Sequence, residues 1–359
     1  MVKDISGNSF VEVNISIIKQ NLKVLKEFLP TNGKQMAVVK ANAYGHGAVE
    51  VARAIEKQVA WFAVNDVEEG IELREVGISN PILVFGVPTA ETAPTYKNHD
   101  LTATVSSLSH FRLLNPGTDY HLNFDTGMGR LGLVQDEITQ TQKAIQNYSE
   151  LRCTGIYSHF ATADNPGSEK AEEQLVRFKS ICQNFEPEIL THMANTGGTA
   201  FYPEAHFDMV RNGIGIYGYA PGSTEIEGLV PAIRWQSHLV QVKQISKGET
   251  VSYGARWKAP ENGFVGTIPM GYEEGIPRLL TGNMEVAINQ QRYTVVGTVT
   301  MNYIMVFLGS SDIPAEGEPV ELLGSRAMTA DQWAANTQTI PYEIVTGISC
   351  RVPRIYKRD

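Results

Sequence analysis

The sequence has few cysteines, no long apolar run and no basic cluster apart from a short C-terminal tail at residues 351–358. Its three cysteines, Cys153, Cys182 and Cys350, are widely spaced and odd in number. This pattern argues against a disulfide scaffold and fits a reducing cytoplasm. No Cys/His group has the spacing of zinc ligands, so no metal site is predicted. The first residues lack the apolar core of a secretion signal, and no window is long and apolar enough for a membrane span.

Acidic residues outnumber basic ones by 39 to 30, which gives a net charge of −9. Binding to nucleic acid needs clustered lysine and arginine, so this balance argues against such a partner. The 359-residue chain is 42% apolar and 19% charged, an ordinary globular composition. We therefore expect a cytoplasmic protein that acts neither on nucleic acid nor in a membrane, with enough residues for two domains.

Short apolar runs alternate with longer amphipathic segments through the first part of the chain. The strand-like runs lie at residues 37–39, 61–64, 82–85, 102–105, 120–124, 155–158, 189–192 and 207–210. Helix-like periodicity separates them, for example at residues 67–76 and 170–182. About eight strands alternating with helices predict a (β/α)8 TIM-type barrel rather than an open sheet.

The pattern changes between Pro221 and Pro231. Beyond this stretch, strand-like runs are close together and separated by turn residues, at residues 237–245, 263–268, 284–288, 293–299 and 305–308. We therefore predict a barrel over residues 1–228 and a β-rich C-terminal domain over residues 229–359. One further strand, at about residues 8–13, is a candidate to pair with the C-terminal domain.

Lys40 stands directly after an apolar run at residues 36–39 and before a turn of small residues. Burial at the end of a strand lowers the pKa of a lysine amine and makes it a usable nucleophile and base. Such an amine commonly holds an aldehyde cofactor covalently, and pyridoxal phosphate (PLP) is the usual aldehyde. A lone lysine in this position is more often solvated, so the surrounding residues decide between the two interpretations.

Other polar and glycine-rich segments follow the later strands of the expected barrel. In such a barrel, functional residues gather at the C-terminal ends of the strands, and phosphate is often bound after the seventh and eighth. The residues at these positions are His159 after the sixth strand, Asn195 and Thr196 after the seventh, and Arg211, Gly213 and Ile214 after the eighth. The Thr196 hydroxyl and the backbone amides near Gly213 and Ile214 are suited to holding a phosphate.

Five motifs resemble those of alanine racemases, and the resemblance covers essentially the whole chain. They are VKANAYGHG at residues 39–47, DTGMGRLG at 125–132, HFATAD at 159–164, SYGA at 252–255 and RVPR at 351–354. The resemblance implies an isomerase with a (β/α)8 barrel and a β domain, which uses PLP to interconvert L-alanine and D-alanine. It also implies a homodimer with shared active sites, and a role in supplying D-alanine for peptidoglycan.

The resemblance assigns roles to individual residues. Lys40 and Tyr253 correspond to two catalytic bases, with Tyr253 placed in the active site of the partner subunit. Racemisation needs proton exchange on both faces of the α-carbon, so one base on each face is a natural arrangement. Residues implied in cofactor binding, besides Lys40, are Tyr44, His159, Asn195, Thr196, Arg211, Gly213 and Ile214. Residues implied in substrate binding are Arg130, Met301 and Tyr272.

Arg211 corresponds to the arginine that hydrogen-bonds the pyridine nitrogen of PLP. An arginine cannot accept a proton and leaves that nitrogen unprotonated, which weakens the cofactor as an electron sink. A barrel-type PLP decarboxylase, the alternative from another enzyme class, benefits from an acidic partner at this position instead. A PLP-binding carrier built on a lone barrel is the non-enzymatic alternative, and the β domain that bears Tyr253 argues against it.

Several positions depart from the family pattern without affecting the two bases, and three of them bear most on the substrate site. Asn302 stands where most relatives have aspartate, and Cys350 where many have a tyrosine that narrows the entrance. Asn123 replaces a lysine that orients the arginine equivalent to Arg130, which leaves Arg130 to be held by Asn123 itself or by a chloride ion. These departures leave open a racemase of broader range, acting on serine or other amino acids.

Overall fold

The computed structural model describes residues 8–358. Residues 1–7, on which the expected absence of a secretion signal rests, and residue 359 lie outside this range. The described chain divides into two compact units, residues 17–230 and residues 8–16 together with 231–358. No helix between residues 8 and 358 is long and apolar enough to cross a membrane.

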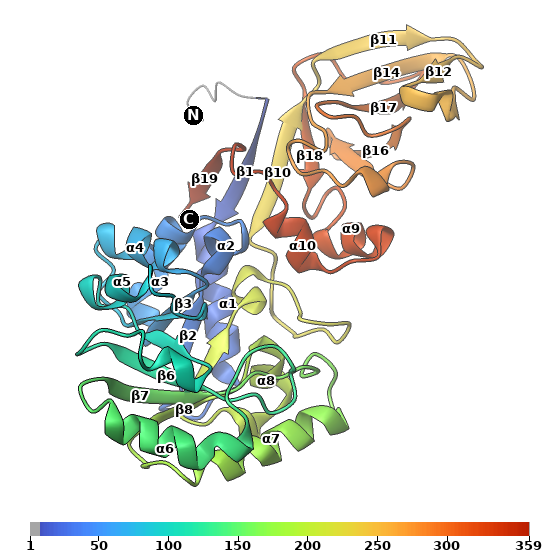
Figure 1. Cartoon of the computed structure of the whole chain (residues 1–359). Helices are drawn as coiled ribbons and strands as arrows, with labels where there is room; N and C mark the ends of the chain where they lie inside the picture. Colours follow the sequence, from blue (N-terminus) through green and yellow to red (C-terminus); the bar gives the residue numbers. More distant parts are fainter. Residues whose placement is uncertain (1–7, 359) are drawn as a thin grey trace. The chain divides into compact units, whose positions relative to one another are not determined.

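Residues 17–230 form a nearly closed barrel of eight parallel strands (Figure 1). The strands are β2 (Lys34–Val38), β3 (Trp61–Val64), β4 (Ile82–Val84), β5 (Ala103–Val105), β6 (Asp119–Asn123), β7 (Arg152–Tyr157), β8 (Leu190–His192) and β9 (Met209–Asn212). They follow one another in chain order, and β9 lies beside β2. A bridge between Leu83 and Thr102 joins β4 to β5, which confirms the predicted barrel.

Helices precede and connect these strands. They are α1 (Ile15–Glu27), α2 (Lys40–Tyr44), α3 (Ala48–Ile55), α4 (Val67–Glu75), α5 (Ala93–Asn98), α6 (Ile138–Asn147), α7 (Glu169–Cys182) and α8 (Thr196–Phe201). Helix α1 buries Ile18, Leu22 and Leu25, which recur every three or four residues and so share one face. The side chain of Asp66 starts α4 by accepting a backbone N–H from the first turn.

Strand β9 differs from the prediction in a way that matters for the site. A strand was expected at residues 207–210, but the observed strand is Met209–Asn212. Phe207 has a φ of 46°, which is incompatible with extended backbone and delays the start of the strand. Arg211 therefore lies within the strand rather than after it.

The other unit contains a nine-stranded sheet to which both ends of the chain contribute. Its strands are β1 (Ser9–Asn14), β10 (Ile233–His238), β11 (Gln241–Ile245), β14 (Gly263–Ile268), β15 (Glu285–Ile288), β16 (Gln291–Val296), β17 (Ile304–Gly309), β18 (Pro319–Leu323) and β19 (Arg354–Lys357). Strand β1 runs antiparallel to β10 and parallel to β19. The hairpin of β12 (Thr250–Val251) and β13 (Trp257–Lys258), and helices α9 (Ala330–Thr337) and α10 (Pro341–Thr346), complete this unit.

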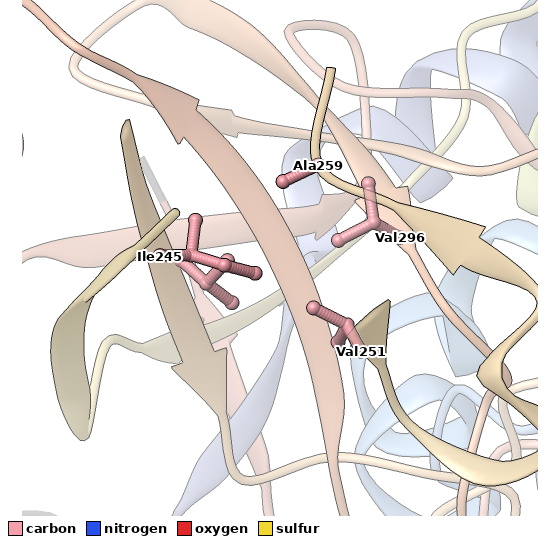
Figure 2. Close-up of a cluster of buried hydrophobic side chains, with 5 residues drawn as sticks. Ile245, Val251, Ala259 and Val296 are labelled. Atoms are coloured by element: carbon pink, nitrogen blue, oxygen red, sulfur yellow. The ribbon is translucent and has the colours of Figure 1, made fainter. Parts of the chain in front are cut away.

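A buried apolar cluster supports one end of this sheet (Figure 2). Its members are Ile245, Val251, Ala259, Val265 and Val296. They come from β11, β12, β14, β16 and the segment after β13, so segments far apart in the sequence are packed together. Val251 directly precedes the SYGA motif, and its burial therefore fixes the start of that turn.

Candidate active site

Lys40 follows β2 at the C-terminal end of the barrel strands. Its Nζ lies 5.9 Å from the centroid of the Phe85 ring. Burial lowers the pKa of the Lys40 amine and the positive charge of Arg130 lowers it further, whereas Glu69 acts in the opposite direction. The amine is therefore neutral more readily than that of a solvated lysine, as a nucleophile or base requires.

The backbone after Lys40 forms a left-handed turn, drawn as α2 in Figure 1. Residues 41–44 have φ values of 52–53°. A left-handed helical conformation costs non-glycine residues roughly 1–2 kcal/mol each, so the turn needs support from its surroundings. The Ala41 N–H donates to a carboxylate oxygen of Glu69 at 2.5 Å. The turn ends at Tyr44, whose side chain is buried.

Several hydrogen-bond donors gather after β8 and β9. Thr196 Oγ1 accepts the N–H of Gly213 at 3.1 Å and that of Gly215 at 3.4 Å, so the Thr196 hydroxyl hydrogen remains to be donated elsewhere. The Gly213 amide, expected to hold a phosphate itself, is thus committed to Thr196. The Ile214 N–H has no hydrogen-bond partner among residues 8–358. A Cβ at Gly213 would lie 2.6 Å from the Tyr44 hydroxyl, which shows how closely that hydroxyl approaches this loop.

Arg211 is buried within β9 and held by four hydrogen bonds from its terminal nitrogens. It donates to the carbonyl oxygens of Ser158 at 2.8 Å and Met193 at 3.0 Å. It also donates to Nδ1 of His192 at 2.8 Å and to Nδ1 of His159 at 3.1 Å. No described residue accepts a hydrogen bond from Arg211 Nε, so this N–H is left for a ligand.

A chain of buried histidines continues inward from Arg211. His192 Nε2 lies 2.9 Å from His121 Nδ1. Because arginine can only donate, His192 accepts at Nδ1 and donates from Nε2 to His121. Burial and the charge of Arg211 lower the pKa of both histidines, that of His121 to about 3, so both are neutral. The sequence suggested no role for either residue, because the contact exists only once β6, β8 and β9 share one barrel.

Asn195 and His159 differ in how far the structure supports their expected roles. The Asn195 side-chain oxygen starts α8 by accepting the Gly198 N–H at 3.0 Å, so only the amide Nδ2, which has no partner among the described residues, remains for a cofactor. His159 contacts Arg211, and burial lowers its pKa well below the usual value. His159 is therefore neutral, and its Nδ1 accepts from the guanidinium.

Arg130 lies exposed in the loop after β6 and makes no hydrogen bond or ion pair with any residue between 8 and 358. Asn123 donates to Ser106 Oγ and to the Leu131 carbonyl oxygen, both at 3.2 Å. Direct support of Arg130 by Asn123, one of the two expected arrangements, is therefore wrong. The Asp125 carboxylate accepts two backbone N–H groups of the same loop and shapes it.

In the β domain, Tyr253 combines a braced backbone with an exposed side chain. The Ser252 hydroxyl donates to the Thr298 carbonyl oxygen at 2.7 Å, and the Thr298 hydroxyl donates to the Tyr253 carbonyl oxygen at 2.9 Å. The Tyr253 side chain is 74% exposed, although large aromatic side chains are usually buried to a greater extent. The phenol is thus presented outward from a rigid turn.

Met301 and Tyr272 lie in two loops of the β domain that are hydrogen-bonded together. The Tyr272 N–H donates to the Thr300 carbonyl oxygen at 3.0 Å, and Asn302 Nδ2 donates to Glu274 at 3.2 Å. The Met301 N–H makes no hydrogen bond within the described chain. Thr300 lines the same groove of about 900 Å³ as Tyr253, so the Met301 loop and the SYGA tyrosine border one cavity.

Family models match both units of the chain. The model of the alanine racemase N-terminal domain matches residues 13–221, and that of the C-terminal domain matches residues 232–356. The chain belongs to the alanine racemase family. Family membership makes it an isomerase with alanine racemase activity, as the sequence motifs predicted.

Individual alanine racemases are similar over nearly their full length. Alanine racemase 2 of Bacillus subtilis is 36% identical over 98% of this chain and 95% of its own. The alanine racemase of Symbiobacterium thermophilum is 37% identical, with 97% of both chains covered. The solved structure of the Clostridium difficile alanine racemase matches with a TM-score of 0.95 and 31% identity, over 99% of this chain and 97% of that one. A Bacillus anthracis alanine racemase with bound L-Ala-P matches with a TM-score of 0.92 and 34% identity, over 99% and 96%.

Proposed function

We propose that this alanine racemase binds PLP through Lys40 and racemises alanine with Lys40 and Tyr253 as bases on opposite faces of the α-carbon. The observation that carries the proposal is the set of donors around Lys40 in the barrel. Arg211 has its terminal nitrogens fixed and its Nε–H unused, as hydrogen bonding to a pyridine nitrogen requires. An aspartate or glutamate in the position of Arg211 would instead accept a hydrogen bond from a protonated pyridine nitrogen.

The other donors in the barrel fit the phosphate of PLP. Thr196 has a hydroxyl hydrogen to donate, Ile214 has an unpaired amide, and the Tyr44 hydroxyl lies against the same loop. Backbone N–H groups and hydroxyls at the start of a helical turn are suited to bind phosphate oxygens. When bound, PLP draws electrons from the substrate α-carbon and so makes its proton removable.

The two bases have complementary properties. The lowered pKa of Lys40 supports a neutral amine that accepts the α-proton on one face, from which the D enantiomer loses its proton. Tyr253, exposed on its braced turn, serves the opposite face. Arg130 and the unpaired Met301 N–H would bind the substrate carboxylate, and Tyr272 would border the entrance.

A homodimer with shared sites follows from the role of Tyr253. A phenol that is 74% exposed in the single chain is available to a second copy. In an arrangement with two-fold symmetry each subunit would supply Tyr253 to the other. We place the enzyme in the cytoplasm, where D-alanine is needed for peptidoglycan precursors.

Exchange of the α-proton in D2O tests the reaction. Purified protein with PLP and L-alanine should lose the α-proton NMR signal while D-alanine forms, and both enantiomers should carry solvent deuterium. Tyr253→Phe should abolish racemisation, whereas Tyr303→Phe, which removes the hydroxyl of another exposed tyrosine of the β domain, should not. Racemisation by Tyr253→Phe at the wild-type rate would refute the two-base assignment.

A racemase of broader range is the second candidate. The position usually held by an aspartate is occupied by Asn302, which is bonded to Glu274, and Cys350 is exposed. Both features change the polarity or size of side chains near the expected substrate entrance. Racemisation rates for L-serine and L-lysine, measured beside that for L-alanine, distinguish the two candidates. Comparable rates on the larger substrates would show a racemase of broader range rather than one specific for alanine.

A further inference from the structure

The left-handed turn at residues 41–44 joins the two cofactor residues proposed above, Lys40 and Tyr44. Any relaxation of this strained turn would change the separation of the Lys40 amine from the Tyr44 hydroxyl. The first amide of the turn, Ala41 N–H, is satisfied by the Glu69 carboxylate, which comes from α4. The contact therefore holds the turn at the point where the backbone first leaves its ordinary conformation.

The second oxygen of Glu69 holds the end of the neighbouring strand. It accepts the N–H of Asn65, directly after β3, at 2.7 Å. The regular ladder between β2 and β3 ends nearby, where the Val39 N–H donates to the Ala63 carbonyl oxygen at 2.9 Å. One carboxylate thus continues the connection between two strands beyond the end of their backbone pairing.

The backbone of Glu69 is itself fixed. Its N–H donates to the side chain of Asp66 at 3.1 Å, in the first turn of α4. A carboxylate anchored at its own backbone and bound through both oxygens has little freedom to move. It is therefore suited to act as a rigid spacer between the end of β3 and the turn.

Glu69 also carries a charge that acts on the Lys40 amine. The charged groups that act on Lys40 are Arg130, which lowers its pKa, and Glu69, which raises it; Lys40 in turn lowers the pKa of His159. Burial affects the Lys40 pKa more strongly than Glu69 does, so the Lys40 pKa is lowered overall. Removal of the Glu69 charge would lower that pKa further.

We propose that Glu69 is a positioning residue for Lys40, which ties the left-handed turn to the end of β3 and so sets the placement of the Lys40 amine relative to Tyr44. The functional part of this inference rests on the proposed binding of PLP by Lys40 and Tyr44. The two hydrogen bonds belong to the chain itself and are tested separately.

Two substitutions remove the charge together with one or with both hydrogen bonds. Glu69→Gln has nearly the same shape but only one accepting oxygen, so one of the two amides loses its partner and the charge is lost. Glu69→Ala removes both acceptors and the charge. Glu72→Ala is the matched control, because Glu72 lies exposed on the same helix and makes no side-chain hydrogen bond within the described chain.

Amide hydrogen exchange is the direct measurement. The Ala41 and Asn65 amides should exchange at least about tenfold faster in Glu69→Ala than in Glu72→Ala, and only one of them should do so in Glu69→Gln. The Kd of the apoprotein for PLP should rise about ten- to hundredfold in Glu69→Ala, and less in Glu69→Gln. Unchanged exchange at both amides in Glu69→Ala, or a PLP Kd within about twofold of the control, would overturn the proposal.

The pH dependence of cofactor attachment gives a readout that a purely structural role would not move. Attachment of PLP to apoprotein requires a neutral Lys40 amine, so its rate rises with pH around the Lys40 pKa. Loss of the Glu69 charge should shift the midpoint to lower pH in both Glu69 variants and leave it unchanged in Glu72→Ala. An unshifted midpoint would refute the proposed effect of the Glu69 charge on the Lys40 pKa. A wild-type protein that binds no PLP would refute the proposed function, while the exchange data would still decide the hydrogen bonds.

Discussion

Replacement of Gly215 by alanine should disturb the expected phosphate site through a single methyl contact. A Cβ at Gly215 would lie 2.6 Å from Cγ2 of Thr196, and 3.2 and 3.3 Å from the methyl groups of Leu25. Ordinary contact begins at 3.4 Å, so Thr196 must move by about 0.8 Å. Thr196 is 2% exposed and its hydroxyl accepts two backbone N–H groups, so it cannot move without displacing that hydroxyl.

The size of the effect follows from the cost of overpacking. Inserting a methyl group into a close-packed site costs about 1–3 kcal/mol. If this cost falls on the cofactor-bound state, the Kd for PLP rises about five- to 150-fold. The threonine methyl, not its hydroxyl, is the group that clashes. Thr196→Ser removes this methyl and keeps the hydroxyl, so the double variant should bind PLP nearly as tightly as the wild type.

Absorbance titration of the apoproteins with PLP gives the four Kd values of this double-mutant cycle. Thr196→Ser alone is the control for the loss of the methyl group. The reasoning is refuted if Gly215→Ala binds PLP as tightly as the wild type. It is also refuted if Thr196→Ser fails to relieve the defect, because the clash would then lie elsewhere.

Three further results are expected. Co-expressed Lys40→Ala and Tyr253→Phe chains, each inactive alone, should regain up to about a quarter of wild-type racemase activity. About half of randomly formed dimers are mixed, and one of the two sites in each mixed dimer is intact. No recovery of activity would contradict the shared site. Glu321→Ala should lower the free energy of unfolding in urea by about 1–3 kcal/mol, because the buried Glu321 carboxylate accepts the Arg326 N–H, which would lose its partner. The cost is not larger, because Arg234 is half-exposed and keeps Glu12 beside it; a loss below about 0.5 kcal/mol would contradict this. The folded-state pKa of His121 is lowered to about 3, so only the unfolded chain protonates this histidine as the pH falls below about 6.5. The free energy of unfolding should therefore fall by up to about 1.4 kcal/mol per pH unit below that pH. His121→Asn should flatten this slope in urea titrations, and an unchanged slope would contradict the assignment.

The barrel could be predicted because its strands are buried on both faces and appear as short apolar runs. The run at residues 61–64 is β3 in full, and that at 263–268 is β14 in full. Strand ends were less predictable, because they depend on single backbone conformations such as that of Phe207. The expected strand at residues 237–245 is in fact two, β10 and β11. The strand-like sequence of residues 237–245 alone could not reveal the break between these two strands.

The positions of Lys40 and Arg211 near the C-terminal ends of barrel strands were predictable, because each adjoins a short apolar run. Glu69 was not, because Asp66 and Glu69 have the spacing of a helix capping box, a sufficient local explanation. In the structure the Glu69 carboxylate instead reaches Asn65 and Ala41. Contacts of this kind connect three elements, and no local pattern specifies which elements will be adjacent.

The position of β1 has a consequence for how the chain is made. Ser9 of β1 pairs with Ser237 of β10, so β1 leaves the ribosome more than two hundred residues before this partner strand. The intervening residues 17–230 contain the whole barrel and form a compact unit of their own. Domains generally fold as units during synthesis, so the barrel should assemble first, as an insertion within an unfinished sheet. The β domain, and with it the turn that bears Tyr253, can be completed only after β19 at the C-terminus has been synthesised.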